Sequence, residues 1–319
     1  DIGSTLTVNR TVTLDLNGCV LKMTGSDSVI KVEADGDLTI QDRNTTTQHK
    51  FNPHCKYLTW YIDMWELDNG GSEIVSGGVI TGGGGDQSNG GGVLVAGGTL
   101  VMAGGSIVGC SAMSRGGGVC NNGTFIMSDG MIKGCTSPDG QYASGGGVRN
   151  SNQFTMTGGM IGDPDNENDA SHVYNTSSQE TTLTISGNAK IYTDITNVGI
   201  LNADGGEIAG TMTNDTNRYG TGTITGSEGA AGSTKFQDKV TNNGTIRKGT
   251  FTNEVINESS GTINGGTFTG AITNNDGTVS DGDFSGATLN GMLVITFDPD
   301  NGDQPSTQKV NWSKDGAAL

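Results

Sequence analysis

Apolar and polar residues alternate over short stretches of this chain, and Gly, Asn or Asp interrupts the alternation every few residues. In TFIMSDGMIKGC (124–135), for example, Phe125 and Met127 alternate with their neighbours before an Asp-Gly break, and Ile132 follows. A period of two is typical of short β-strands with one face turned inward. The Gly, Asn and Asp breaks supply the positive φ angles that tight turns need. Helical spacing does not recur in the sequence, which argues against a helical solenoid.

Two phrases recur along the chain. The first is GGGV, at 90–93, 116–119 and 145–148, with starts 26 and 29 residues apart. A second phrase follows each copy, as TLVMAGGSIVGC (99–110), TFIMSDGMIKGC (124–135) and QFTMTGGMIGD (153–163). Further on the period shortens to 17 and 16 residues, in GTIRKGTFTNEVIN (244–257), GTINGGTFTGAITN (261–274) and GTVSDGDFSGATLN (277–290). Periods of this length indicate stacked supersecondary units.

Short strands repeated at this period predict an all-β fold, a right-handed parallel β-helix over residues 1–290. Each coil pairs with the next through its backbone, so equivalent side chains stack at the strand spacing. We therefore expect four ladders: Met102, Met127 and Met156; Ile107, Ile132 and Ile161; Phe251, Phe268 and Phe284; and a turn ladder of Asn257, Asn274 and Asn290.

Three phrases carry a resemblance to a known group of proteins. LDLNGCVLKM (14–23), GGVITGG (77–83) and the GGGV repeats resemble the Gly-rich, right-handed β-helix surface proteins of gut bacteria. The match covers residues 5–290, and it implies an extracellular protein on a bacterial cell surface. It specifies the fold more than the function, because adhesins, lyases and hydrolases all use β-helices.

The tail carries a second resemblance. MLVITFDPDNGDQPSTQKVNW (292–312) is similar to the start of the internalin-type (Listeria–Bacteroides) B-repeat, in the strand 294–298, the turn DPDNGD and the returning strand 307–312. The later part of that module is missing. The resemblance implies that residues 291–319 form a truncated small β module, and that the chain is a monomeric fragment of a longer, multi-module surface protein.

Composition narrows the range of partners. The 319 residues carry a net charge of −17 and no basic cluster, which argues against nucleic-acid binding because phosphate contacts need a Lys/Arg surface. No apolar run reaches the roughly 20 residues of a membrane-spanning helix. The five cysteines are Cys19, Cys55, Cys110, Cys120 and Cys135. Their odd number and the absence of a CxxC pair predict buried free thiols, and we expect Cys110 and Cys135 to stay unbridged on adjacent coils.

One segment, residues 43–72, interrupts the repeats and concentrates aromatic and acidic side chains. Aromatic rings beside carboxylates are suited to sugar recognition, because rings pack on sugar faces and carboxylates accept from hydroxyls. A projecting loop is also a common place for function. The alternative is a hairpin that packs its aromatic residues over the side of the solenoid. The candidate ligand-binding residues of this segment are Tyr57, Trp60, Tyr61, Asp63, Trp65 and Glu66.

A second unusual segment is the acidic run DPDNEND, residues 163–169. Its alternating carboxylates are similar in spacing to a calcium loop, but position six is Asn168 instead of Gly and position twelve is Tyr174 instead of Glu. We therefore expect a solvated acidic loop, and we predict no metal site and no cofactor.

Catalytic patterns are weak in this sequence. A β-helix hydrolase needs clustered carboxylates, and the nearest group, Asp276, Asp281 and Asp283, falls in turns. His49, His54 and His172 have no nucleophile motif beside them. We therefore expect a surface adhesin or glycan-binding module without catalytic activity, whose partner is a host or dietary glycan or a surface protein. The alternative is a polysaccharide lyase or glycoside hydrolase acting in the β-helix groove.

Overall fold

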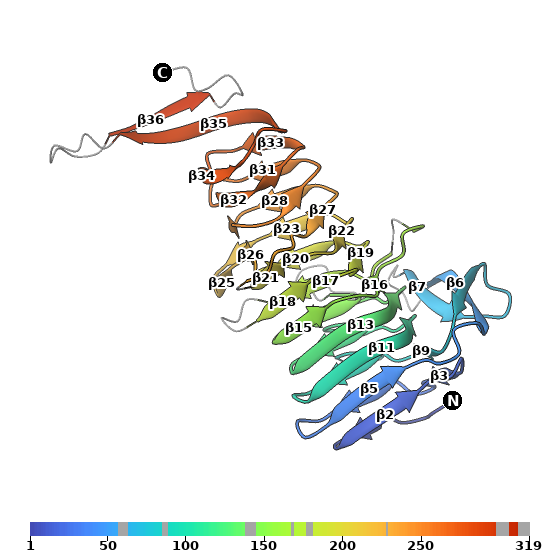
Figure 1. Ribbon diagram of the computed structural model, residues 1–319. Coiled ribbons are helices and arrows are strands. Elements are labelled where there is room, and N and C mark those ends of the chain that lie inside the picture. Colours follow the sequence, from blue (N-terminus) through green and yellow to red (C-terminus); the bar gives the residue numbers. More distant parts are fainter. Residues whose placement is uncertain are drawn as a thin grey trace.

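The computed structural model describes residues 1–56, 63–84, 89–137, 145–166, 169–176, 181–227, 229–297 and 306–311. Every regular element in these ranges is a β-strand, and the strands stack into a parallel β-helix with three walls (Figure 1). The fold class expected from the repeats is therefore confirmed. No helix among the described residues is long and apolar enough to cross a membrane.

The first wall is one continuous parallel sheet that ends in an antiparallel strand. Its strands, in sheet order, are β1 (Leu6–Val8), β4 (Ile30–Val32), β10 (Val93–Val95), β12 (Val119–Asn121), β14 (Val148–Asn150), β17 (Val173–Asn175), β20 (Ile195–Asn197), β23 (Met212–Asn214), β28 (Val240–Asn242), β31 (Val255–Asn257), β33 (Ala271–Asn274), β35 (Thr288–Phe297) and β36 (Ser306–Asn311).

The second and third walls share several long strands that bend from one wall to the other. The second wall contains β2 (Thr11–Asp15), β5 (Asp37–Gln41), β11 (Thr99–Val108), β13 (Thr124–Lys133), β15 (Gln153–Met156), β18 (Thr182–Ile185), β21 (Ile200–Ala203), β26 (Thr223–Thr225), β29 (Thr245–Ile246), β32 (Thr262–Phe268) and β34 (Thr278–Asp283). The third wall contains β3 (Val20–Lys22), β9 (Val79–Thr81), β16 (Met160–Ile161), β19 (Lys190–Ile191), β22 (Glu207–Ile208), β27 (Lys235–Phe236) and β30 (Thr250–Phe251), with the second halves of β11, β13, β32 and β34.

Stacked apolar columns fill the space between the walls. Met102, Met127 and Met156 are register partners on successive coils and are fully buried, as predicted. The Ile107, Ile132 and Ile161 column is also confirmed. That column continues through β19 and β22 into the phenylalanine ladder, because Ile208 pairs with Phe236. The predicted isoleucine and phenylalanine ladders are therefore one column of the third wall.

The phenylalanine part of this column is a stack of rings. Phe236, Phe251, Phe268 and Phe284 follow one another with centroid separations of 4.5, 4.8 and 5.1 Å and interplanar angles of 11°, 10° and 18°. Parallel in-register pairing places identical side chains directly above one another, so near-parallel rings at about the strand spacing follow from the geometry.

Asparagines form a longer ladder than the sequence predicts. The side-chain amide of each member donates to the Oδ1 atom of the next, over seven bonds of 2.7–2.8 Å. The members are the last residues of eight successive first-wall strands, from β12 to β33: Asn121, Asn150, Asn175, Asn197, Asn214, Asn242, Asn257 and Asn274. Every member is buried, so the amides satisfy one another in place of water.

The predicted third member, Asn290, is not part of this ladder. Asn274 is in register with Gly291, and Asn290 pairs with Thr273. The repeat phrase shifts by one residue in the last coil, and a shift of one residue turns a strand side chain to the other face.

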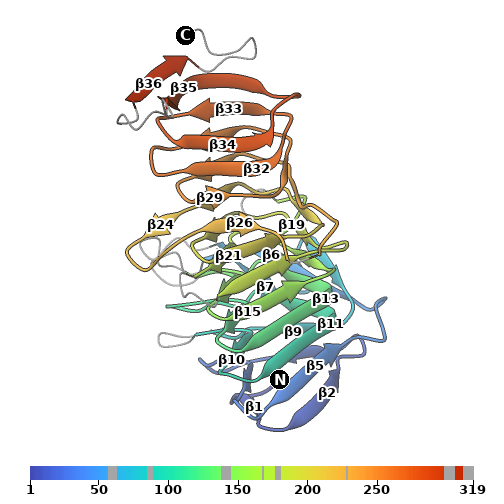
Figure 2. The same cartoon turned by 60° about the vertical axis from the view of Figure 1, so that its left-hand side comes forward.

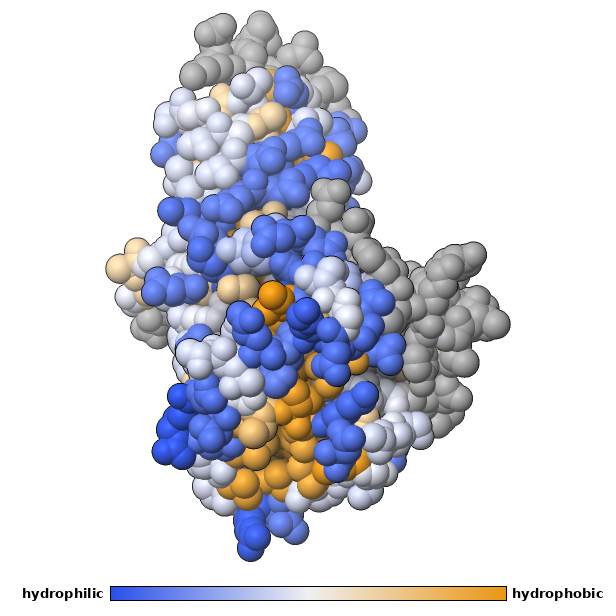
Figure 3. Space-filling model, turned by 90° about the vertical axis from the view of Figure 1, so that its right-hand side faces the viewer, coloured by the Kyte–Doolittle hydropathy of each residue, from blue (hydrophilic) through white to orange (hydrophobic). Residues whose placement is uncertain are grey.

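The two ends of the solenoid differ. At the N-terminal end, Val12 and Leu14 of β2 are only half-buried and Leu6 of β1 is 40% exposed. An apolar area is visible at this lower end of the molecule (Figure 3). At the other end, β35 pairs with β33 over Thr288–Gly291 and then with antiparallel β36 over Met292–Phe297 (Figure 2). One strand thus runs through the predicted boundary between residues 290 and 291.

The cysteines follow the prediction in part. Cys110, Cys120 and Cys135 are free and buried, whereas Cys19 is free and exposed. The side chain of Cys55 lies outside the described residues. Burial raises the pKa of the Cys135 thiol well above its usual range, and the neighbouring Cys110 adds to this effect.

Candidate functional site

The segment predicted to hold the ligand site forms a small antiparallel sheet on the side of the solenoid. β6 (Gln48–Lys56) lies between β7 (Asp63–Leu67) and β8 (Glu73–Ser76). Its base is fixed to the solenoid by Asp42, whose carboxylate accepts from the Gly18 and Gly78 amides at 2.7 Å each. His49 adds a contact of 3.0 Å between its Nε2 atom and the Gly18 carbonyl. We refer to this sheet, residues 48–76, as the side sheet.

Trp65 of β7 attaches the side sheet to the third wall. Its side chain is 2% exposed and packs with Phe51, at a centroid separation of 6.4 Å. The Lys133 ammonium lies 4.3 Å from the centre of the indole ring. A Cβ atom at Gly134 would lie 2.1 Å from Trp65 Cγ, so this position in the third wall must be glycine. Gly134 also has a φ of 59°, which glycine adopts without strain.

A sugar-binding platform would need Trp65 to offer a ring face to solvent, whereas the buried indole holds the side sheet. Glu66, the next residue, is exposed. The backbone of Asp63 lies in β7, but its side chain is outside the described residues, as are Tyr57, Trp60 and Tyr61. Trp65 and Phe51 pack as the hairpin alternative for this segment predicts. For the other candidate residues, sugar binding stays a prediction.

The acidic run 163–169 is not a solvated loop at its two ends. Asp163 and Asp169 are both 6% exposed. The Asp163 carboxylate accepts from the Lys133 ammonium at 3.1 Å. Asp169 accepts from the Gly134 amide at 3.1 Å and the Ser171 amide at 2.9 Å. Burial raises the pKa of Asp169, against the lowering effect of these hydrogen bonds. The two end carboxylates of the run are therefore held by Lys133, Gly134 and Ser171, whereas Asp165 between them is exposed as predicted.

A different place offers an open polar surface. A hollow of about 490 Å³ lies on the third wall, on the coils of β19, β22 and β27. We refer to it as the groove. Lys190, Glu207 and Lys235 project from these three strands as register partners, so they form a column of alternating charge on the outer face. The remaining lining residues are Gly187, Asn188, Ala189, Gly206 and Ser233.

The charged side chains of the groove form only weak ion pairs with one another. Lys190 and Glu207 form an ion pair of 3.8 Å, and their side chains are 45% and 34% exposed. Lys235 is exposed and forms no ion pair within the described part of the chain. Exposed pairs of this length contribute little to stability. These side chains are thus able to turn toward a ligand at small cost.

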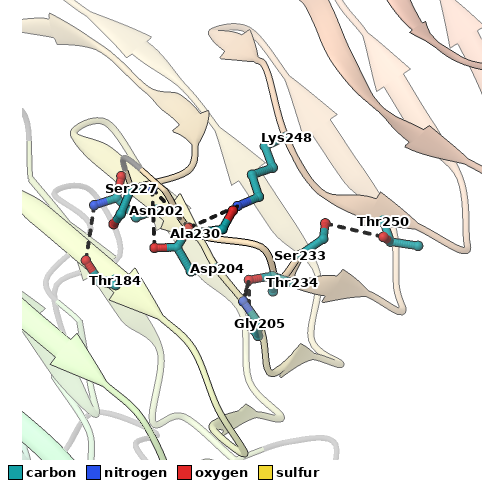
Figure 4. Close-up of polar contacts among 10 residues, drawn as sticks. All are labelled: Thr184, Asn202, Asp204, Gly205, Ser227, Ala230, Ser233, Thr234, Lys248 and Thr250. Atoms are coloured by element: carbon teal, nitrogen blue, oxygen red, sulfur yellow. Dashed lines mark hydrogen bonds and ion pairs between the residues drawn. The ribbon is translucent and has the colours of Figure 1, made fainter.

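A loop beside the groove is held by a fixed polar network (Figure 4). Asp204, which follows β21, accepts from the Ser227 amide at 3.0 Å and from the Lys248 ammonium at 3.2 Å. Lys248 also donates to the Ala230 carbonyl at 3.3 Å. Thr234 donates to the Gly205 carbonyl at 2.7 Å, which fixes the chain next to Ser233 of the groove lining.

Asp204 is the electrostatic centre of this network. Burial opposes its ionisation, but the hydrogen bonds from Ser227 and the Lys248 ammonium outweigh burial, so the pKa of Asp204 is lowered. The carboxylate is therefore anionic at neutral pH and acts as a fixed anchor for the loop.

Sequence reasoning missed the groove. The loop TGSEGAAGST (225–234) consists of residues that also occur in the turns of every coil, so its composition gives no signal. The available signal was length, because the step from β26 to β27 is longer than the corresponding step from β29 to β30. An enlarged turn in one coil of a solenoid is a common place for function.

Comparisons with known proteins add no identification. No protein-family model, no curated protein and no solved structure matches this chain.

Proposed function

We propose that this chain is a glycan-binding β-helix module of a bacterial cell surface, without catalytic activity, and that the groove holds the sugar. The observation that carries the proposal is the mixed lining of the groove. A carboxylate, two ammonium groups, an amide and a hydroxyl line one open hollow. Sugar hydroxyls both donate and accept hydrogen bonds, so a surface with both kinds of partner suits them.

The small residues of the groove support the same ligand. Gly187, Ala189 and Gly206 line the groove beside the charged residues and add little or no side chain to its floor. A sugar ring is able to lie flat on such a floor while its hydroxyls reach Glu207 and Lys235. The parallel stacking of coils keeps this floor rigid, because every coil is hydrogen-bonded to the next.

The charge state of the nearby Asp204 carboxylate favours binding over hydrolysis. A glycosidase needs one carboxyl with a raised pKa as general acid and a second as base or nucleophile. The pKa of Asp204 is instead lowered by its hydrogen bonds to Ser227 and Lys248. This group is better suited to accepting hydrogen bonds than to donating a proton.

The cell-surface location rests on the resemblance of the repeats and of the tail to bacterial surface modules. A row of modules also offers an advantage for binding. A single open groove binds a sugar weakly, and several copies on one surface raise the overall affinity.

The test is binding of the purified chain to an array of plant and mucin oligosaccharides, followed by calorimetry on the sugars retained. We expect Glu207→Gln and Lys235→Ala each to weaken binding several-fold. The matched control is Lys31→Ala, which removes a lysine of the first wall that is paired with Glu33. It should bind as the wild type does.

Three results would contradict the proposal. Equal binding by the groove variants and the control would exclude the groove. Loss of binding in Trp60→Ala, with the groove variants unaffected, would place the site in segment 43–72. Release of new reducing ends from a bound polysaccharide would favour the alternative of a carbohydrate-active enzyme.

A further inference from the structure

An arginine lies in the middle of the outer face of the first wall. Cys120, Arg149 and Tyr174 are register partners on β12, β14 and β17, and alternation along each strand turns all three side chains away from the core. The Arg149 guanidinium lies 5.4 Å from the centre of the Tyr174 ring. The ring supports one face of the guanidinium and limits its orientation.

Arg149 is only partly satisfied by its surroundings. Its Nε atom is buried and has no hydrogen-bond partner among the described residues. A buried donor without an acceptor costs free energy, and such groups are rare in folded proteins. Arg149 also forms no ion pair within the ranges that the structure describes.

A second arginine, Arg115, lies beside the first. Arg115 forms a parallel β-bridge with Asn89. The next residue, Gly116, lies in a turn that folds back on β12, so a Cβ atom at Gly116 would lie 2.8 Å from the Cα atom of Cys120. This turn places the backbone beside Arg115 against β12, whose Cys120 is the register partner of Arg149. Burial lowers the pKa of Arg149, and repulsion from Arg115 lowers it further. Arg115 is exposed, and no ion pair to it occurs among the described residues.

In the part of the chain that the structure describes, the neighbouring titratable groups do not neutralise the two arginines. Burial raises the pKa of the Cys120 thiol and the pKa of the Tyr174 hydroxyl, so both groups are uncharged at neutral pH. The Asp215 carboxylate affects the pKa of Tyr174. The charged or ionisable groups that affect the pKa of Arg149 are Arg115, Cys120 and Tyr174. Two guanidinium groups therefore concentrate positive charge on one spot of a chain whose net charge is −17.

We propose that Arg115 and Arg149 bind an oxyanion, a carboxylate or sulfate ester carried by an acidic glycan, on the outer face of the first wall. Guanidinium groups match the geometry of carboxylate and sulfate oxygens and form strong, charge-assisted hydrogen bonds with them. Tyr174 positions Arg149 for this contact. The glycan part of the proposal rests on the function proposed above, whereas the oxyanion part stands on the arginine pair alone.

The test compares three oligosaccharides of similar length by calorimetry: a neutral galactan, a sulfated galactan and an oligogalacturonate. We expect Arg115→Gln to weaken binding of at least one acidic sugar about tenfold, because a hydrogen bond to a charged group contributes that much. Arg247→Gln is the matched control, since Arg247 is also exposed and the charge change is the same. Binding of the neutral galactan should be equal in both variants.

Arg149→Lys gives a second measurement, because it keeps the charge and removes the planar donor pair. We expect it to weaken the acidic sugar as Arg115→Gln does, with an unchanged melting temperature as evidence of folding. Binding should also weaken as sodium chloride is raised, because salt screens the charges. The response to sulfate or to galacturonate tells which oxyanion the site prefers.

The outcomes separate this proposal from the previous one. Equal affinities of Arg115→Gln and Arg247→Gln for both acidic sugars would overturn the oxyanion site. Arginine-dependent binding of an acidic sugar, with no binding of any neutral sugar, would support the oxyanion site and count against the groove. Arginine-dependent binding of inorganic sulfate alone, with no sugar retained, would support the anion contact and overturn the glycan assignment.

Discussion

The Lys133 ammonium lies over the face of the Trp65 indole, 4.3 Å from its centre. Lys133 belongs to the third wall and Trp65 to the side sheet, so this contact joins the two parts. The same ammonium binds the Asp163 carboxylate of the next coil at 3.1 Å. One buried cation thus links the solenoid, the side sheet and the acidic run 163–169.

Removal of this cation should be costly. We expect Lys133→Met to destabilise the chain by about 3–5 kcal/mol, because it leaves the Asp163 carboxylate buried without a partner. Lys133→Met combined with Asp163→Asn should recover part of that loss. Urea unfolding of the three proteins checks this, and equal stabilities of the single and double variants would contradict the buried pair.

Loss of the indole should release the side sheet. We expect Trp65→Ala to cost about 3–5 kcal/mol, the range for a large buried aromatic residue. The effect should be local, with faster amide exchange in β6, β7 and β8 and little change in β28 or β31. Glu66→Ala, at the neighbouring exposed position, should stay within about 0.5 kcal/mol of wild type.

An interruption of the asparagine ladder should take one hydrogen-bond partner from the neighbouring amide on each side. Asn197 accepts from Asn175 and donates to Asn214, so Asn197→Ala leaves two buried amides with one partner fewer. We expect a loss of about 1–3 kcal/mol for each orphaned group. Asn202→Ala removes a half-buried amide bonded to Thr184 and serves as the control in chemical denaturation. A similar loss in both variants would mean that the ladder adds no stability of its own.

The Asp204 network should respond to acid. Because its folded pKa is lowered, Asp204 stabilises the protein above the ordinary Asp pKa of about 4. That contribution is lost as the pH falls through the lowered value. We expect the melting temperature to fall below about pH 4, and Asp204→Asn to flatten that fall. Asp35→Asn, which removes a carboxylate from an exposed turn, is the matched control.

The cysteines should differ in reactivity. Cys19 is exposed, so iodoacetamide should modify it in the native protein at pH 8. Burial raises the pKa of Cys120 and of Cys135, so both should react only after unfolding. Peptide mapping by mass spectrometry checks each site. Native alkylation of Cys135 would show that the third wall opens around it.

The repeats predicted the coils well because each coil places the same kind of side chain at the same inward position. Met127 and Ile132 had to be inward once period two and the repeat length were known, since the next coil repeats both positions. The asparagine ladder was only partly predictable. The repeat phrases align Asn274 with Asn290, but backbone pairing places Gly291 opposite Asn274. Backbone pairing, and not the repeat phrase, therefore sets the register in the last coil.

The sites were harder to predict because they depend on contacts between distant residues. The residues that flank Trp65 in the sequence do not tell whether its side chain faces solvent or packs on Gly134. Only the fold brings Trp65 and Gly134 together. The pairing of Arg115 with Arg149 is equally invisible in sequence, because 33 intervening residues separate them. The groove depends on the enlarged turn before Lys235, whose residues resemble those of any other turn.

The strand β35 has a mechanical consequence. Its first residues are bonded to β33 and its last residues to β36, so a tether attached beyond β36 would load the last coil directly. The bonds between coils run along the solenoid axis, and tension on that axis would open them one coil at a time. The asparagine ladder lies in the same direction, and the β35 residue in register with Asn274 is Gly291, which has no side-chain amide to extend it. Under load, the last coil would peel away before the part of the solenoid that the asparagines hold together.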